Sequence, residues 1–435
     1  MSHRLKLCVL LGLAMTAIAF GVQRFPPPQF ETPHTIPTPT TPLPKSVTVE
    51  IVDTAVLAAA LALAAYLIHR HRRRGWIIAM SLFSLLYFGF WRKGCVCSVG
   101  AVGNLTLAIF DSSYALPLTV LAFFLLPLLF ALFFGRIFCG AVCPLGMVQE
   151  LILIRPLRVP VWLEASLRLL AWLYLGLALL MAATGSAFVI CRYDPFVAFF
   201  RLGANPQMWV ISISFLLMSL FVGRPYCRFL CPYGVILRQF SRLSKWRVTI
   251  TPDECIHCRL CEDACPYGAV QKPNVEWPHD QRIKARRRVR ALIVLLPVIA
   301  LLGGWVGHQS AATLSQSHPT VRLAEQVRLQ QAGLLARPTD ETTAFAATGQ
   351  SIETLYSQAA AKQRQFAIGA TLLGAAMGLL CGLTLVRTHI CFRQDEYQAH
   401  RAGCVACGRC FISCPREHLR RNPKYPTIAE GSSPC

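Results

Sequence analysis

Two runs of four cysteines have the clearest chemistry in the sequence. CIHCRLCEDACP occupies Cys255–Pro266, and CVACGRCFISCP occupies Cys404–Pro415. Both have the C-x2-C-x2-C-x3-C-P spacing of bacterial ferredoxins, in which three close thiolates bind one 4Fe–4S cluster and the fourth binds the neighbouring cluster. This exchange predicts one cluster on Cys255, Cys258, Cys261 and Cys414, and a second on Cys404, Cys407, Cys410 and Cys265. Zinc and structural disulfides are the alternatives, but zinc usually takes two separated cysteine pairs.

A second cysteine motif, G-R-x-x-C-x-x-x-C-P-x-G, occurs twice. The first frame is Gly135–Gly146 and the second frame is Gly223–Gly234, each after an apolar run. The opening glycine is expected to end one helix and the proline to begin the next. The second cysteine then lies at a positive helix end, which is expected to lower the pKa of its thiol. We interpret these cysteines as iron–sulfur or metal ligands, with a redox dithiol, a copper site or simple packing as alternatives: Cys139, Cys143, Cys227 and Cys231.

Three more cysteines fall at the opposite ends of the same helical hairpins. Cys95 and Cys97 lie in GCVCSVG, and Cys191 lies in ICRYDPF. The hydrocarbon core of a membrane is about 30 Å thick, which is too wide for a single electron-transfer step. We therefore hypothesise that these three cysteines hold an outer metal or cofactor, an intermediate station for the electron. The remaining cysteines lack partners at a useful spacing and are read as helix or tail residues: Cys8, Cys381, Cys391 and Cys435.

The elements that position these cysteines are predicted to be membrane helices. Of the 435 residues, 54% are hydrophobic and only 15% are charged, which is unlike an ordinary soluble protein. Apolar runs of about 17–21 residues are long enough to span a bilayer. The fold class is therefore an all-α polytopic membrane protein with about eight spans: Leu7–Val22, Ile51–Ile68, Gly75–Trp91, Ala115–Phe134, Ser166–Thr184, Trp209–Val222, Ala291–Val306 and Phe366–Val386.

The net charge of +22 is expected to orient these helices rather than to bind nucleic acid. Basic residues cluster beside the spans, as in HRHRRR (His69–Arg74) and KARRRVR (Lys284–Arg290), and no aromatic residues interleave with them. Alternating the spans from an inside N-terminus places both frames and both ferredoxin runs on the cytoplasmic side of the inner membrane. Thiolates that bind iron also need a reducing compartment.

The chain is predicted to contain one split 2×4Fe–4S ferredoxin domain, interrupted by two membrane helices. The predicted parts are a signal anchor or signal peptide (1–23), a Pro/Thr-rich periplasmic linker (24–50), a six-span-type membrane core with repeated cysteine hairpins (51–248), the first ferredoxin half (249–283), a transmembrane helix (284–306), a periplasmic segment (307–364), a transmembrane helix (365–388), and the second ferredoxin half with the tail (389–435).

The frames, KGCVCSVG and the paired ferredoxin runs resemble the NosR/NapH-type membrane polyferredoxins. The resemblance covers Lys93–Gly268 and Cys404–Pro415. It implies that electrons pass between the cytoplasmic side or the quinol pool and a periplasmic acceptor, often a flavin-bearing one. NosR proteins carry their own periplasmic flavin domain, whereas this chain has a Pro/Thr linker there. The resemblance therefore implies that any flavin lies on a partner protein.

These observations predict a membrane electron-transfer subunit rather than an enzyme with its own small-molecule pocket. The expected cofactors are two 4Fe–4S clusters, with one or more further iron–sulfur or metal centres in the membrane core. The expected partners are a cytoplasmic or quinol donor and a periplasmic flavin protein or metalloprotein acceptor. Two alternatives remain: a CcoG-like cupric reductase or metalloenzyme assembly factor, and a non-redox assembly scaffold whose clusters are structural.

Overall fold

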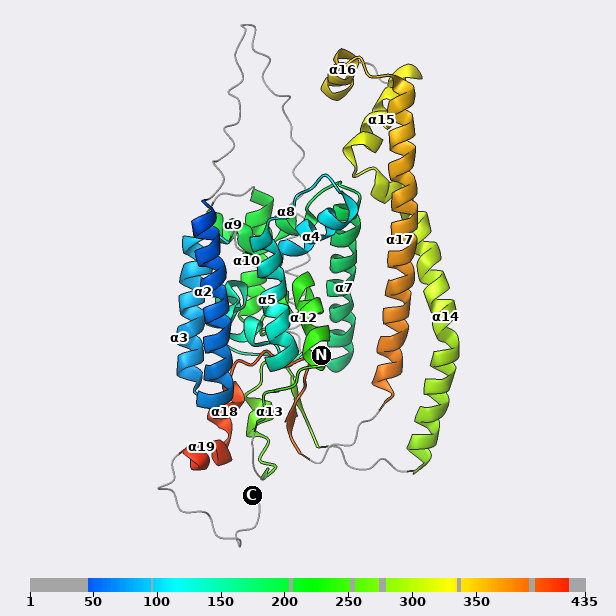
Figure 1. The fold of residues 1–435 in the computed structure, drawn as a ribbon. Coiled ribbons are helices and arrows are strands. Elements are labelled where there is room, and N and C mark those ends of the chain that lie inside the picture. The colour runs from blue at the N-terminus through cyan, green and yellow to red at the C-terminus, as the bar shows by residue number, and fades with distance from the viewer. Residues whose placement is uncertain are drawn as a thin grey trace.

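The described part of the computed structural model is a bundle of membrane helices with a small ferredoxin unit at one end (Figure 1). It covers residues 46–94, 97–202, 206–250, 255–273, 279–334, 338–390 and 396–421. The predicted first span, most of the Pro/Thr linker, Cys8, Cys95, Cys391 and Cys435 lie outside these residues.

Helices make up nearly all of the regular structure. The helices, with η for π-helical segments, are α2 (Val47–Tyr66), η1 (Leu67–His71), α3 (Arg74–Ser84), η2 (Leu85–Trp91), α4 (Ala101–Phe110), α5 (Leu118–Phe134), η3 (Phe138–Val142), α6 (Pro144–Ile152), α7 (Val161–Ala183), α8 (Val189–Tyr193), α9 (Pro195–Arg201), α10 (Pro206–Ser219), α11 (Pro225–Phe229), α12 (Pro232–Arg242), α13 (Leu260–Asp263), α14 (His279–Ser315), α15 (Pro319–Gln331), α16 (Asp340–Ala347), α17 (Ile352–Thr388), α18 (Arg409–Ser413) and α19 (Pro415–Arg421). The strands are β1 (Val270–Gln271) and β2 (Gln398–Ala399).

The mostly helical membrane architecture is confirmed, but the count of eight spans is not. Among the described residues, five helices are long and apolar enough to cross a membrane: α2 with η1, α3 with η2, α7, the Ala285–Ser315 part of α14, and α17. The apolar runs predicted around α5 and α10 do form helices, of 17 and 14 residues, which are shorter than the other five. Pro117 precedes α5, and Gly135, with φ of 75°, ends it.

The two longest helices, α14 and α17, form an antiparallel hairpin beside the rest of the bundle (Figure 1). A Cβ atom on Gly303 of α14 would overlap the carbonyl oxygen of Gly374 on α17, so the two backbones touch. Small residues permit such close approach between membrane helices. Both helices continue beyond the predicted spans, and α15 and α16 fold within the 307–364 segment that joins them.

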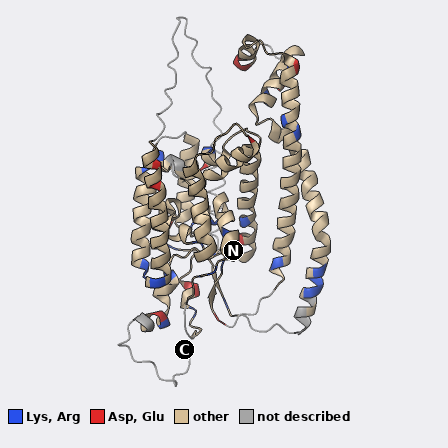
Figure 2. Ribbon diagram, viewed as in Figure 1, with Lys and Arg blue, Asp and Glu red and all other residues tan. Residues whose placement is uncertain are grey.

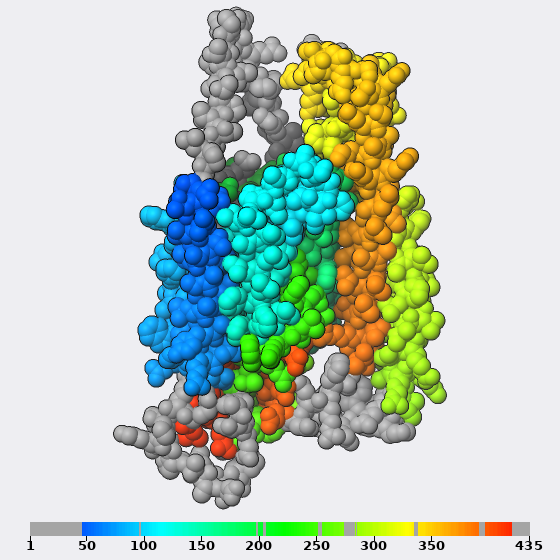
Figure 3. Space-filling view, in the orientation of Figure 1, coloured from blue at the N-terminus to red at the C-terminus, as the bar shows by residue number. Residues whose placement is uncertain are grey.

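The two ferredoxin halves, although separated in sequence by this hairpin, form one unit. Strand β1 pairs antiparallel with β2, and α13 packs against α18. In the space-filling view the C-terminal half lies directly beneath the helical core (Figure 3). Lys and Arg residues cluster at the same end, at the α2–α3 junction and at the start of α14 (Figure 2). The ferredoxin unit therefore shares one end of the molecule with both basic clusters, as the sequence predicts.

Arg72, between α2 and α3, fastens both ferredoxin halves to the membrane helices. It is 6% exposed and has the left-handed φ of 52°. Its Nε donates to Oε1 of Glu417 at 2.9 Å, and its Nη2 donates to the carbonyl oxygens of Thr249 and Ile250 at 2.8 and 2.9 Å. Its guanidinium also lies 4.1 Å from the centre of the Phe411 ring. In the sequence, Arg72 is recognisable only as part of the basic HRHRRR cluster that is expected to orient the helices.

Candidate iron–sulfur electron-transfer site

The first predicted ligand set lines a single cavity. Cys255, Cys258, Cys261 and Cys414 surround it together with Tyr397 and Arg416. Cys414 reaches this set from the other ferredoxin half because α18 packs against α13. The structure thus brings together the four cysteines that the crossed ferredoxin pattern groups.

The second predicted set also converges. Cys404, Cys407, Cys410 and Cys265 lie close enough for their charges to interact. Backbone N–H groups point at the sulfurs: Ala406 donates to Cys404 Sγ and Ala269 donates to Cys265 Sγ, both at 3.4 Å. Burial raises the pKa of Cys404 to about 12, so this thiol needs a bound cation to ionise.

Both sets offer the four thiols that a 4Fe–4S cluster takes as ligands. Among the described residues, no three His, Cys, Asp or Glu side chains converge closely enough to hold one metal ion. A cubane cluster places each thiolate on a different iron and therefore needs wider spacing. Residues with positive φ turn the loops between the cysteines, at His257 and Arg259 in one run and at Ala406 and Gly408 in the other.

The two frames build matched turns between the membrane helices. Pro144 and Pro232 begin α6 and α12, as predicted, and Cys143 and Cys231 are the residues just before them. Gly135 ends α5, also as predicted, with a positive φ of 75°.

The prediction that Gly223 ends a helix in the same way is wrong. Helix α10 ends earlier, at Ser219, and the left-handed residue is Arg224. Gly223 is needed for another reason. A Cβ atom there would stand 3.0 Å from the Tyr267 ring and 3.2 Å from Pro266 of the first ferredoxin run.

The four frame cysteines lie together, three of them buried and Cys143 half-buried. The Cys143 thiol hydrogen-bonds with the Cys227 sulfur, and Cys231 lies close enough to Cys227 and Cys139 for their charges to interact. Gln149 Nε2 donates to Cys227 Sγ at 3.2 Å, and the N–H of Gly234 donates to Cys231 Sγ at 3.3 Å. We call Cys139, Cys143, Cys227 and Cys231 the frame quartet.

The expected low pKa of the helix-end cysteines is not found. Hydrogen bonding to Cys227 and burial raise the pKa of Cys143 well above its ordinary value. Burial and the nearby Cys227 raise the pKa of Cys231. The same hydrogen bond from Cys143 lowers the pKa of Cys227 to about 7. The hydrogen bond to Cys227 at Cys143, and burial at both cysteines, outweigh the helix dipole.

The first frame touches the second ferredoxin set. A Cβ atom on Gly140 would overlap the carbonyl oxygen of Val405 and lie 3.1 Å from that of Ala406. Arg136 bridges the same junction, because its Nη1 donates to the Ala402 oxygen at 3.3 Å and its Nη2 to Cys139 Sγ at 3.6 Å. The backbone between Cys404 and Cys407 therefore lies directly against the frame quartet.

Glu150 holds this junction together. Its carboxylate accepts from Arg409 at 2.7 Å, from Arg224 at 3.3 Å, and from the Tyr267 hydroxyl. Burial raises the pKa of Glu150, but the two guanidinium groups and Tyr267 overcome this and hold it at about 2. Glu150 is therefore ionised at neutral pH and joins both ferredoxin halves to α6.

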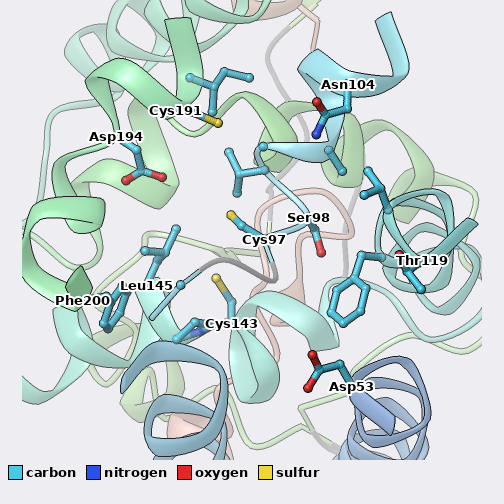
Figure 4. A pocket seen from close by; sticks show the side chains of 18 of the residues that line it. Asp53, Cys97, Ser98, Asn104, Thr119, Cys143, Leu145, Cys191, Asp194 and Phe200 are labelled. Atoms are coloured by element: carbon cyan, nitrogen blue, oxygen red, sulfur yellow. The ribbon is translucent and has the colours of Figure 1, made fainter. Parts of the chain in front are cut away.

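Two of the outer cysteines line a cavity of about 240 Å³ (Figure 4). Cys97 and Cys191 line it from the turn before α4 and from α8, and Cys143 of the quartet lines it from below. Asp194 also lines it, and burial raises the pKa of that carboxyl to about 6. The cavity thus connects the quartet with two of the three outer cysteines; Cys95 lies outside the described residues.

Comparison with known proteins agrees with this arrangement. A sequence profile described as a 4Fe-4S binding domain matches residues 116–160 and 205–251, and a second 4Fe-4S binding domain matches residues 248–271. The methylamine utilization ferredoxin-type protein MauN of Paracoccus denitrificans is 30% identical over 241 residues, which are 47% of this chain and 83% of MauN. The chain belongs to the NosR/NapH-like family of 4Fe–4S membrane proteins. No solved structure matches it.

Other relatives share only parts of this NosR/NapH-like protein. An uncharacterized protein of Methanocaldococcus jannaschii is 29% identical over 200 residues, 43% of this chain and 80% of that protein. The regulatory protein NosR of Pseudomonas aeruginosa is 33% identical over 211 residues, 43% of this chain but only 28% of NosR. The family supports an electron-transfer role for this membrane protein.

Sequence reasoning missed the charged residues that assemble the site. Glu150 was not singled out, although it is an isolated acid just after the first frame in an otherwise apolar helix. The frame motif includes an arginine at its second position, but the sequence does not indicate what that arginine contacts. In this NosR/NapH-like protein Arg136 and Arg224 are 3% and 2% exposed and make specific contacts at the junction.

Proposed function

We propose that this protein relays single electrons through four stations in a fixed order. The order is the first ferredoxin set, the second ferredoxin set, the frame quartet and the outer cavity. The observation that supports it most directly is the contact between Gly140 of the first frame and Val405 of the second set. It favours the second set over the first as the neighbour of the membrane cysteines.

The residues proposed as ligands fit bound iron–sulfur clusters. Backbone N–H groups donate to sulfurs in both ferredoxin sets, from Glu262 to Cys261 in the first and from Ala406 to Cys404 in the second. Each frame cysteine is buried or half-buried. Bound clusters would supply one-electron chemistry over a wide range of potentials. The protein's contribution is to fix the spacing of the sets and to exclude water from the quartet.

The proposed partners lie at opposite ends of the molecule. A cytoplasmic or quinol donor would deliver electrons at the ferredoxin end, and a periplasmic flavin protein or metalloprotein would take them at the cavity end. The basic clusters at the ferredoxin end support a cytoplasmic location for that end in the inner membrane.

The outer cavity is the proposed last station, with Cys97 and Cys191, and Cys95 by sequence, as its metal ligands. It is lined by sulfur and carboxylate groups within reach of Cys143. The test is metal analysis of a Cys95→Ser, Cys97→Ser, Cys191→Ser variant. Loss of iron or copper with intact ferredoxin signals supports the station, and unchanged metal content removes it from the relay.

Redox titration of anaerobically purified protein, followed by electron paramagnetic resonance, tests the relay as a whole. The relay predicts ferredoxin signals and an additional signal that disappears in Cys139→Ser and Cys227→Ser variants. Clusters that do not change state within the physiological range would favour an assembly scaffold instead. Copper bound at the quartet and turnover of cupric ions would favour a CcoG-like cupric reductase.

A further inference from the structure

Five arginines gather between the frame quartet and the second ferredoxin set. They line a small cavity of about 20 Å³ together with Cys139, Cys227 and Val405. We call Arg136, Arg168, Arg224, Arg228 and Arg238 the arginine cluster. They come from both frames, from α7 and from α12, so the fold collects them at this one place.

The arginine cluster carries more positive charge than its carboxylates neutralise. Arg224 pairs with Glu150, while Arg168 and Arg228 share Glu164. Within the part of the chain that the structure describes, Arg136 and Arg238 contact no carboxylate, and the Nε atoms of Arg136, Arg168 and Arg238 have no hydrogen-bond partner. Arginine stays protonated in proteins, and buried charge is costly unless it is paired.

The missing negative charge can come from the cysteines beside the cluster. Four thiolates bound to an iron–sulfur centre outweigh the charge of its core, and each added electron makes the centre more negative. Burial alone therefore opposes reduction of the quartet centre, whereas nearby positive charge and hydrogen bonds to sulfur favour it. Arg136 supplies both, because it is buried and donates to Cys139 Sγ at 3.6 Å.

We propose that the arginine cluster raises the reduction potential of the centre held by the frame quartet and so makes it the electron acceptor of the ferredoxin unit. This inference rests on the proposed relay and adds a direction to it. The first ferredoxin set does not line the cavity of the arginine cluster. One of its cysteines, Cys258, is exposed, and the acidic residues Glu262 and Asp263 directly follow Cys261.

The step itself is a transfer of one electron. With clusters bound, the centre on the first ferredoxin set would lose one electron, and the centre on the frame quartet would gain it by way of the second set. No covalent bond forms or breaks, and neither set needs a proton. The electron comes first from a one-electron reductant at the ferredoxin end, for which dithionite serves in the test.

The test measures the potential of each centre in Arg136→Gln and Arg238→Gln, using the full-length protein purified anaerobically. Arg242→Gln is the matched control, since it removes the same charge from an exposed position on the same helix as Arg238. We expect the quartet signal to shift to lower potential in both test variants, with unchanged iron content and no shift in the control. At a fixed dithionite ratio, the fraction of protein with a reduced quartet falls.

An unchanged or higher quartet potential in both variants would overturn the inference. If the glutamine variants lose iron, Arg136→Lys and Arg238→Lys decide the matter: retained iron and potential support a role for charge, while loss of iron in these variants also overturns it. A wild-type protein without any quartet signal would contradict the proposed relay itself, which separates failure of the relay from failure of this inference.

Discussion

Replacing Gly140 by alanine should separate the frame quartet from the second ferredoxin set. The added Cβ atom would overlap the Val405 carbonyl oxygen. Cβ atoms in proteins essentially never come within 3.0 Å of another heavy atom, and ordinary van der Waals contact begins at 3.4 Å. The Val405–Ala406 loop must therefore retreat by more than 0.4 Å. Because Gly140 does not have a positive φ, alanine adds this clash without backbone strain.

Overpacking of this kind costs about 1–3 kcal/mol, which lowers the ratio of docked to displaced loop by about 5- to 150-fold. The assay is rapid mixing of the oxidised protein with dithionite, following the ferredoxin and quartet signals separately. We expect normal reduction of the ferredoxin sets and slowed reduction of the quartet. Gly75→Ala is the control, because nothing lies within 4 Å of its added Cβ. Equal quartet reduction in the two variants would refute the proposed contact route.

Three further substitutions probe the contacts that assemble the molecule. Glu150→Gln leaves buried guanidinium groups without their carboxylate and should destabilise the ferredoxin junction by about 3–5 kcal/mol. The temperature at which cluster absorbance is lost measures this effect. An unchanged temperature in the variant would contradict the prediction. Gly303→Ala should destabilise the α14–α17 hairpin by about 1–3 kcal/mol, whereas Gly304→Ala, whose Cβ would lie 3.5 Å from its nearest neighbour, should not. Hydrogen exchange of the α14 and α17 amides in the two variants measures this difference. Equal exchange in both variants would show that the two backbones are not in contact. Arg72→Gln should lower the iron content because both ferredoxin halves lose their hydrogen bonds to this arginine. Arg73→Gln, a change at the exposed neighbouring residue, should leave the iron content unchanged. Equal iron content in the two variants would show that Arg72 does not hold the ferredoxin halves to the membrane helices.

Features fixed by local spacing were predictable. The crossed grouping of Cys265 and Cys414 follows from the ferredoxin pattern, and the structure brings these cysteines to the expected sets. Proline at the start of α6 and α12 is equally local, because its fixed φ and missing N–H suit the first turn of a helix.

Features that depend on tertiary packing were not predictable. The pairing of Arg72 with Glu417 joins residues 345 positions apart, so nothing in either segment indicates it. Gly223 has the same sequence context as Gly135, yet its role is set by Tyr267 from another part of the chain. The thiol pKa of Cys231 followed burial rather than the helix end, because dehydration depends on the surrounding fold.

The most direct test of the relay is the iron and acid-labile sulfide content per chain of anaerobically purified protein, with electron paramagnetic resonance of the reduced sample. Two ferredoxin sets alone would account for about eight irons. The relay predicts clearly more than that in the wild type, falling toward about eight in Cys139→Ser and Cys227→Ser variants as the quartet centre is lost. A content of about eight irons in wild type and variants alike would contradict it, because the membrane cysteines would then hold no cluster.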